Sequence, residues 1–226
     1  AVVSHPAVRK VTFTGSQEVG EQIMRTAGLK KVTMELGSNS PLIVLPDADV
    51  EKVALATVQN GYANAGQACI STQRVYVDKA VYGDYLDALA PMVAALPSGD
   101  PMGDAIKVGP MVRESDAQGV ESWINEAVGA GARLIEGGGR NGAVLAPSIL
   151  ADVHPDMKVS REELFGPAVG VTPIEGIEEA IEYANDTRYG LSAAIFTENI
   201  DNALRFALEV ESGNININGG TQFRAD

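Results

Sequence analysis

The sequence predicts an α/β protein with three layers, in which a mostly parallel sheet lies between two layers of helices. Short runs rich in Val, Ile and Thr alternate with longer stretches whose apolar residues recur at helical spacing. Strands and helices that alternate at this length are typical of βαβ units, which form a mostly parallel sheet. Ala, Val, Ile and Gly are abundant and aromatic residues make up only 5% of the chain, a composition that suits packed α/β layers.

The first expected elements are a short strand and a helix. The run from Val11 to Thr14 is rich in β-formers and ends at Gly15, and Ser16 stands where a helix N-cap is expected. Apolar residues at helical spacing then continue towards Gly28. Because glycine commonly ends helices, we expect the helix to stop there.

The rest of the chain repeats this alternation. The motif "ELGSNSP" interrupts it, and we expect a domain boundary near residues 35–40. In chain order, the other expected elements are extended runs at 31–34 and 41–45, a helix through 49–66, a strand at 74–77, helices at 80–96 and 114–130, a strand at 133–136, a helix at 177–185, a strand at 192–197, a helix at 200–210 and a strand at 213–217.

Composition and charge exclude several classes of function. The formal net charge is −13, so the basic residues that neutralise nucleic-acid phosphates are missing. No apolar run approaches the roughly 18–20 residues that span a bilayer. One cysteine cannot form an internal disulfide, and two distant histidines cannot complete a structural zinc site. We therefore expect a cytoplasmic protein with no nucleic-acid partner, no membrane association and no metal.

The only cysteine, Cys69, lies in "NAGQACISTQR". It could be a small buried packing residue, which is a common role for a cysteine outside a disulfide. Gly66, Gln67 and Ser71 surround it in what reads as the loop before a helix, where exposed N–H groups favour a thiolate. No histidine is placed to activate the thiol, which disfavours a Cys–His hydrolase. On the residues alone, both the packing role and the reactive role stay open.

Two glycine-containing motifs could hold a phosphate. "TGSQEVG" places Gly15 and Ser16 at a strand-to-helix junction, where N–H groups and the helix dipole can bind an anion, although an ordinary capped turn is commoner. "EGGGRNG" matches the pattern G-x-G-x-x-G, but the strand-like "AVLAPSIL" follows it where a helix is required. We expect a hairpin or loop at this second motif and no cofactor site.

Six motifs, taken in order, resemble the aldehyde dehydrogenase superfamily. They are "FTGSQEVG", "MELGSNSP", "NAGQACISTQR", "EELFGP", "ANDTRYGLSAAIFT" and "GNININGG". The resemblance covers essentially the whole chain, and the spacing of Glu35 from Cys69 fits it. It implies oxidation of an aldehyde to a carboxylic acid with NAD or NADP as the cofactor.

The resemblance also implies roles for single residues. Cys69 matches the nucleophile that forms a thiohemiacetal and then a thioester, and its backbone N–H matches part of the oxyanion hole. Glu35 matches the general base that activates water for hydrolysis. Asn64 does not match the oxyanion asparagine of the family. The matched cofactor-binding positions are Gly15, Ser16, Leu36, Glu163 and Phe165.

By the same resemblance, residues 1–36 are the end of a Rossmann-like NAD(P)-binding domain. Residues 37–226 are then a catalytic domain that is incomplete at its C-terminal end. We expect the chain to be a fragment of a homodimeric or homotetrameric protein and to be inactive by itself, since half of the cofactor site lies outside it. Ser38 and Asn39 depart from the usual "ELGGKNP", which bears on subfamily and leaves Glu35 in place.

Two alternatives remain beside hydrolytic oxidation. A CoA-acylating aldehyde dehydrogenase passes the thioester to CoA, but such relatives generally lack the glutamate that matches Glu35 here. The other alternative is a non-catalytic fragment. A thiol hydrolase is a remote third possibility, because no histidine is suitably placed.

Overall fold

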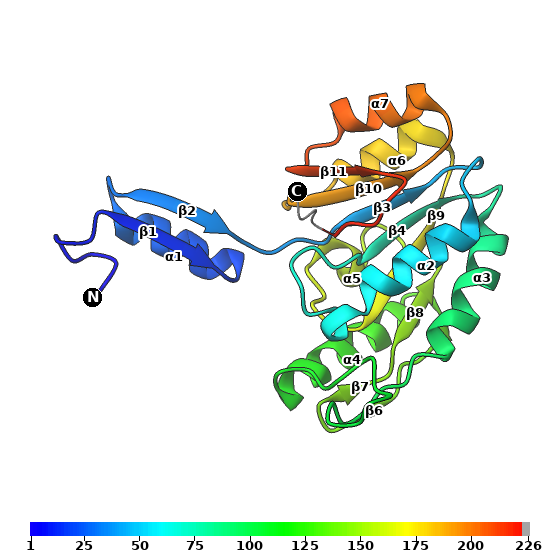
Figure 1. Ribbon diagram of the computed structural model, residues 1–226, viewed down its shortest axis with the longest axis horizontal. Coiled ribbons are helices and arrows are strands. Elements are labelled where there is room, and N and C mark those ends of the chain that lie inside the picture. The colour runs from blue at the N-terminus through cyan, green and yellow to red at the C-terminus, as the bar shows by residue number, and fades with distance from the viewer. Residues whose placement is uncertain (223–226) are drawn as a thin grey trace. The chain divides into compact units, whose positions relative to one another are not determined.

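The computed structural model describes residues 1–222, and the chain divides into two compact units, Ala1–Ser38 and the remainder from Asn39. The first unit is a strand, a helix and a strand: β1 (Lys10–Thr14), α1 (Gln17–Ala27) and β2 (Lys31–Glu35) (Figure 1). β1 and β2 pair in parallel, with Phe13 opposite Met34. This is one βαβ unit, because parallel neighbours need a crossover connection.

A seven-stranded sheet forms the centre of the second unit, in the order β11-β10-β3-β4-β9-β8-β5. Every neighbouring pair is parallel except β5 and β8. This confirms the predicted mostly parallel sheet. The strands are β3 (Pro41–Val44), β4 (Arg74–Asp78), β5 (Arg133–Glu136), β8 (Ser148–Ala151), β9 (Ala168–Ile174), β10 (Ser192–Phe196) and β11 (Asn214–Ile217), and a separate hairpin joins β6 (Arg140–Asn141) to β7 (Val144–Leu145).

Helices cover both faces of this sheet, which gives the three predicted layers (Figure 1). On β3, Leu42 and Val44 pack under α2 and α3, whereas Ile43 packs under α6 and α7. A parallel strand between two helical layers is apolar on both sides for this reason. On β8, Leu150 belongs to a third cluster under α4 and α5. The helices are α2 (Val50–Gly61), α3 (Tyr82–Ala94), α4 (Glu114–Gly129), α5 (Lys158–Arg161), α6 (Gly176–Asn185) and α7 (Ile200–Glu209). In residues 1–222, none of the helices has the length and apolarity to cross a membrane.

Most predicted elements are confirmed, with ends displaced by a few residues. Ser16 caps α1 by accepting a hydrogen bond from the Val19 amide, and Gly28 ends the helix with a φ of 63°. The expected helix through residues 49–66 is wrong in its last turn, because α2 ends at Gly61 and a short 3-10 segment, η1 (Ala63–Gly66), follows. The "EGGGRNG" motif forms the expected hairpin.

β9 is the central strand that the sequence pattern does not predict. Its sequence, "AVGVTPI", contains a glycine and a proline, and both residue types normally argue against a strand interior. Even so, β9 pairs with β4 along five residues, with Pro173 opposite Val77, and most of its residues are buried. Pairing on both sides and burial therefore outweigh local propensity at this position.

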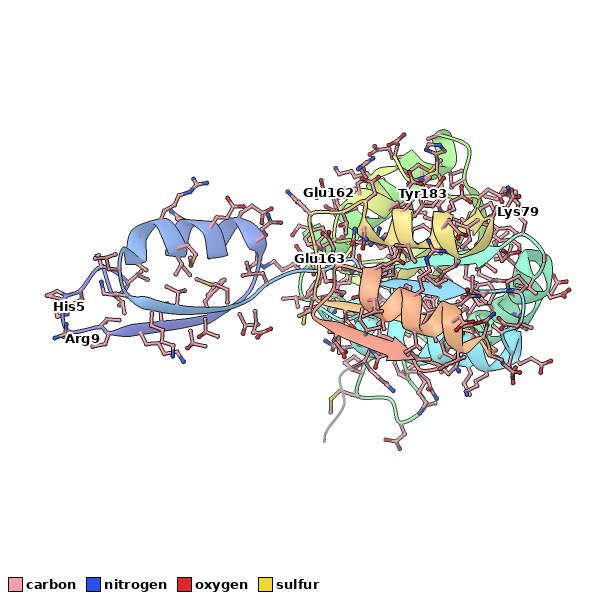
Figure 2. The ribbon with its side chains drawn as sticks, turned by 90° about the horizontal axis from the view of Figure 1, so that it is seen from above. His5, Arg9, Lys79, Glu162, Glu163 and Tyr183 are labelled. Carbon is pink, nitrogen blue, oxygen red and sulfur yellow. The ribbon has the colours of Figure 1, made fainter. Side chains whose placement is uncertain are left out.

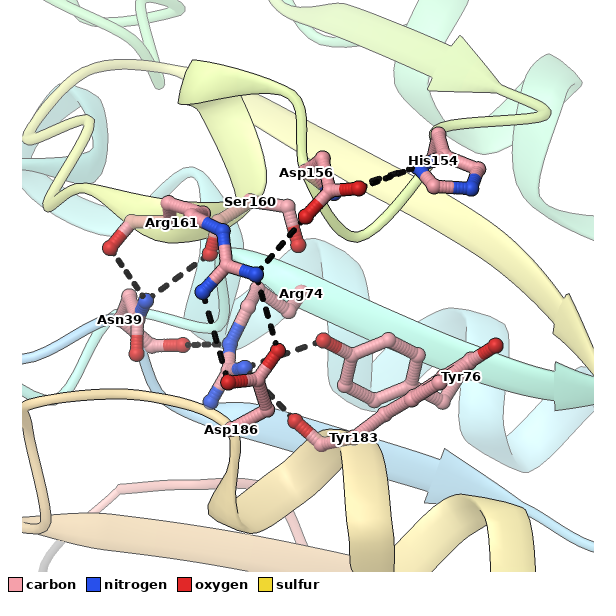
Figure 3. A network of polar contacts seen from close by, with 9 residues as sticks. All are labelled: Asn39, Arg74, Tyr76, His154, Asp156, Ser160, Arg161, Tyr183 and Asp186. Carbon is pink, nitrogen blue, oxygen red and sulfur yellow. Dashed lines mark hydrogen bonds and ion pairs between the residues drawn. The ribbon is translucent and has the colours of Figure 1, made fainter.

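Arg74, at the start of β4, anchors the edge of the second unit where the chain enters it (Figure 3). Its buried guanidinium donates to the carbonyl oxygens of Asn39 (2.8 Å), Tyr183 (3.0 Å) and Ala184 (3.2 Å) and to the Tyr76 hydroxyl (3.0 Å). The last carbonyls of a helix lack intrahelical donors, and Arg74 supplies donors at the end of α6. Burial lowers the pKa of the Arg74 guanidinium, and the Tyr76 hydroxyl acts in the opposite direction.

The side chain of Asn39 extends this network (Figure 3). Its Nδ2 donates to the Ser160 carbonyl at 2.9 Å, and its Oδ1 accepts from the Thr187 hydroxyl at 3.1 Å. Asn39 stands where "ELGGKNP" has a lysine. The amide therefore joins the first residue of the second unit to the end of α5 and to the segment after α6.

Replacing Arg74 by leucine is expected to lower the free energy of unfolding by about 3 kcal/mol, because three carbonyls and one hydroxyl lose a buried charged donor. Urea unfolding followed by the fluorescence of the single tryptophan, Trp123, measures this change. Lys79→Leu is the control, since it removes an exposed ion pair with Glu175 (3.2 Å). The control should change stability by less than about 1 kcal/mol. Equal effects of the two substitutions would contradict the anchoring role of Arg74.

Candidate active site

Cys69 lies in a turn between η1 and β4, so the predicted loop-to-helix start is wrong. Ile70 is still in the turn, and β4 begins four residues later at Arg74. The run "ISTQRVYV" is rich in β-branched residues, and the pairing of β4 between β3 and β9 draws it into the sheet. The thiol is half-buried. Cys69 is therefore not itself at a helix N-terminus, and the geometry of the turn decides how the thiol is presented.

The backbone just before Cys69 is held in an unusual conformation. Asn64, Ala65 and Gly66 have successive φ values of 52°, 55° and 69°. Left-handed backbone costs roughly 1–2 kcal/mol for each residue that carries a Cβ. The Asn64 and Gln67 side chains stabilise the turn by donating to each other's backbone carbonyls, both at 3.1 Å. A Cβ built at Gly66 would lie 2.0 Å from the Gly166 carbonyl oxygen, so only glycine permits this approach.

Polar side chains beside Cys69 are used to hold its loop. The Ser71 hydroxyl donates to the Asn60 carbonyl (3.2 Å) at the end of α2. The hydroxyls of Thr72 and Thr221 are 2.8 Å apart, and Thr221 also donates to the Ile70 carbonyl at 2.7 Å. The loop is therefore tied both to α2 and to the chain that follows β11. Such supporting contacts are what fix a reactive group in one geometry.

The "EELFGP" motif forms a second loop, which precedes β9. Leu164 is buried in the cluster under α4 and α5, and its amide donates to the Gln73 Oε1 at 2.7 Å. Phe165, the next residue, has a φ of 51° and remains 40% exposed. A positive φ is a genuine outlier for a bulky side chain, and such strain is concentrated at ligand sites. The backbone at Phe165 thus directs the ring away from the core.

Glu163 and Phe165 line a cavity of about 480 Å³ in the second unit. Gln67, from the Cys69 loop, lines the same cavity, and its Oε1 accepts a hydrogen bond from the Val112 amide at 2.9 Å. The predicted residues Glu163 and Phe165 are thereby brought together beside the loop of Cys69. Leu164, from the "EELFGP" motif, also lines it, and the remaining lining residues belong to no motif that indicates them in the sequence: Met111, Val112, Arg113, Asp116, Gly119, Val120 and Trp123.

The two loops lie at the amino ends of neighbouring strands. Cys69 precedes β4 and Glu163 precedes β9, and these strands pair in parallel. Figure 2 shows Glu163 at one end of the second unit and Lys79, which follows β4, at the other. Most open α/β sheets bind ligands at the carboxyl ends of their strands. The candidate site of this unit therefore lies at the other end of the strands, their amino ends.

The four remaining predicted residues lie in the first unit, at the carboxyl end of its strand pair. The Gly15 amide donates to the Glu35 carbonyl at 3.1 Å. Ser16 is the N-cap of α1, and Glu35 is the last residue of β2. Leu36 packs over α1, because a Cβ added at Gly20 would lie 2.6 Å from its Cδ2. Their assignment to cofactor binding and catalysis stays a prediction.

The fold and the grouped loops define an α/β protein whose half-buried thiol lies in a loop beside an aromatic-lined cavity. The sequence profile of the aldehyde dehydrogenase family matches residues 1–226. A 3-sulfolactaldehyde dehydrogenase of Priestia aryabhattai is 45% identical over 219 residues, which are 97% of this chain and 46% of the relative. A benzaldehyde dehydrogenase of Bacillus subtilis is 38% identical over 221 residues, again 97% and 46% of the two chains.

Solved structures of the same family superpose closely on this chain. An NADP-dependent glyceraldehyde-3-phosphate dehydrogenase from Bacillus halodurans, complexed with NADP, gives a TM-score of 0.97 at 35% identity over 100% of this chain and 47% of that one. Lactaldehyde dehydrogenase from Escherichia coli gives 0.95 at 35% identity over 99% and 48%. The chain belongs to the aldehyde dehydrogenase family, as its motifs suggest. It spans about half the length of the curated relatives it matches.

Gly66→Ala is expected to lower the free energy of unfolding by about 3 kcal/mol or more, since the new methyl group meets the Gly166 carbonyl in a left-handed backbone. The substitution should also change the rate at which iodoacetamide alkylates Cys69. Gly83→Ala is the matched control, because a Cβ at Gly83 meets no atom within 4 Å. The control should leave both urea unfolding and alkylation nearly unchanged. A Gly66 variant that behaved like the control would refute the close packing of the two loops.

Proposed function

We propose that the protein carrying this chain oxidises an aldehyde to a carboxylic acid, with NAD or NADP as the hydride acceptor. The packing of the Cys69 loop against the loop of Glu163 and Phe165 is the observation that carries this proposal. Gly66 meets the Gly166 carbonyl, and Gln73 holds the Leu164 amide. Covalent attack and hydride transfer occur on the same carbon, so the nucleophile and the nicotinamide site must be adjacent. The matching relatives are named for their action on sulfolactaldehyde, benzaldehyde and lactaldehyde.

In the proposed mechanism, the Cys69 thiolate attacks the aldehyde carbon and forms a C–S bond, and the carbonyl oxygen becomes an oxyanion. The backbone N–H of Cys69 donates to this oxyanion. NAD or NADP, when bound, would supply the hydride acceptor for the tetrahedral carbon held on Cys69. The loss of that hydride re-forms the C=O bond and leaves an acyl thioester on Cys69.

Glu35 completes the cycle as the general base. Its carboxylate takes a proton from water, the resulting hydroxide attacks the thioester carbon, and the thiolate leaves as the acid forms. The sum of the steps is aldehyde, oxidised cofactor and water giving acid, reduced cofactor and a proton. The first unit would thus belong to the cofactor-binding domain and the second to the catalytic domain.

The residues of both units suit parts of a dinucleotide. The 480 Å³ cavity offers the exposed ring of Phe165 to a flat heterocycle and the Glu163 carboxylate to ribose hydroxyls. The start of α1, beside Gly15 and Ser16, would offer the positive end of the helix to a pyrophosphate. Leu36 follows Glu35 directly, and its own backbone would lie near the nicotinamide.

The nearest alternative is a CoA-acylating enzyme, in which CoA takes the acyl group from Cys69. The presence of Glu35 favours hydrolysis, because transfer to CoA needs no base for water. We further propose that the complete protein is a homodimer or homotetramer. The 226-residue chain by itself should give negligible turnover, since it spans about half of its relatives.

Cys69→Ala in the full-length protein is expected to reduce turnover by at least about 10³-fold, because the covalent route is lost. The measurement is the formation of reduced cofactor with a panel of 3-sulfolactaldehyde, lactaldehyde and benzaldehyde. Binding of NADH or NADPH to the same variant is the control and should persist. Unchanged turnover would remove Cys69 from the mechanism.

Glu35→Gln is expected to give a rapid burst of reduced cofactor followed by slow turnover, because the thioester forms but water is no longer activated. Mass spectrometry of the quenched variant should find the acyl group on Cys69. Product analysis with and without CoA separates the two chemistries. Acyl-CoA without free acid from the unmodified enzyme would establish the CoA-acylating alternative.

A further inference from the structure

Gln73 connects the two loops of the candidate site. Its side chain is 1% exposed, and its Oε1 accepts the hydrogen bond from the Leu164 amide at 2.7 Å. Its backbone amide donates to the Ser40 carbonyl at 3.3 Å, and its backbone carbonyl accepts from the Gly170 amide at 2.9 Å. This one residue therefore contacts the chain entering β3, the loop before β9 and β9 itself.

Only one of the two polar atoms of the Gln73 amide is used in a hydrogen bond within residues 1–222. The Nε2 of Gln73 is buried and has no hydrogen-bond partner among residues 1–222. A buried donor without an acceptor is costly, and an apolar side chain would remove this donor only by leaving the Leu164 amide without its acceptor. The useful atom of the side chain is thus Oε1, which faces the Leu164 amide.

Leu164 is the residue through which Gln73 acts. Its side chain is buried under α4 and α5, and its amide is held by Gln73, so it is fixed at both ends. Glu163 precedes it and Phe165 follows it, with a φ of 51° at Phe165. A strained residue keeps its conformation only where its surroundings over-determine it. Without the Gln73 acceptor, the backbone at Phe165 can relax and the directions of Glu163 and the ring change.

We propose that Gln73 is a positioning residue, whose Oε1 holds the Leu164 amide so that Glu163 and Phe165 stay aligned with the Cys69 loop. Gln73 acts through the loop and does not touch the reacting atoms. This inference rests on the proposed function, because the residues it aligns are the proposed contacts of the cofactor. Its effect should therefore fall on cofactor binding more than on the reactivity of the thiol.

The test compares three variants of the full-length protein. Gln73→Met removes the acceptor while keeping the length of the side chain, Gln73→Asn keeps an amide that is too short to reach Leu164, and Gln73→Glu keeps an oxygen acceptor. We expect Gln73→Met and Gln73→Asn to weaken NADH or NADPH binding about tenfold, measured by the fluorescence of the reduced cofactor. Gln73→Glu should keep most of the original affinity. KM for NAD(P) should rise while KM for the aldehyde and the alkylation rate of Cys69 stay near their original values.

Thr57→Val is the control for a general loss of stability. It removes the buried hydrogen bond between the Thr57 and Tyr85 hydroxyls (2.9 Å), which joins α2 to α3 and involves no residue of either loop. The midpoint temperature of thermal unfolding should fall for Thr57→Val, while its affinity for the reduced cofactor stays unchanged. The inference is wrong if Gln73→Met and Gln73→Asn bind the cofactor as the unmodified protein does, or if Thr57→Val weakens binding equally. If the unmodified protein binds neither NADH nor NADPH, the proposed function fails as well.

Discussion

The contact between Gly66 and the Gly166 carbonyl is the constraint on which the candidate site depends. It brings together two loops that are far apart in the chain, one before β4 and the other before β9. No side chain can enter this contact, because a Cβ at Gly66 would overlap the carbonyl oxygen. The left-handed backbone at Asn64 and Ala65 is the cost of reaching this position. Packing of this kind leaves a single arrangement of the two loops.

The sheet makes that contact possible. β4 and β9 are adjacent and parallel at the centre of the second unit, so the loops that precede them emerge side by side at one edge. Arg74 reinforces the same edge on the other face of the sheet by joining β4 to the end of α6 and to Asn39. The left-handed backbone before Cys69 and the hydrogen bonds of Arg74 therefore both act where the chain enters β4. Rigid elements beneath a site are what hold its groups in a productive geometry.

Local patterns predicted most of the fold, and they failed where local and tertiary preferences disagree. The Ser16 cap, the Gly28 stop and the "EGGGRNG" hairpin follow from short-range chemistry and are confirmed. The sequence does not predict β9, because Gly170 and Pro173 are residue types that normally argue against a strand interior. Pairing with β4 and β8 stabilises the strand all the same. The loop around Cys69 was expected to start a helix, yet Cys69 lies in a turn and the chain after the loop pairs in the sheet as β4. Hydrogen bonds between strands depend on partners distant in the chain, and local periodicity does not contain them.

By itself, the sequence determined the α/β class, the order of most elements and the motifs that resemble the aldehyde dehydrogenase family, since these depend on residue type and spacing. The family comparison confirmed that resemblance. Only the tertiary structure decided that Gln73 holds the loop of Glu163 and Phe165 through the Leu164 amide, and that Gln67 binds the Val112 amide. It also decided that Arg113, Asp116 and Trp123 line the same cavity as Gln67. The physical reason is that these contacts join segments distant in the chain. They arise from the order of strands in the sheet, which no short stretch of sequence specifies.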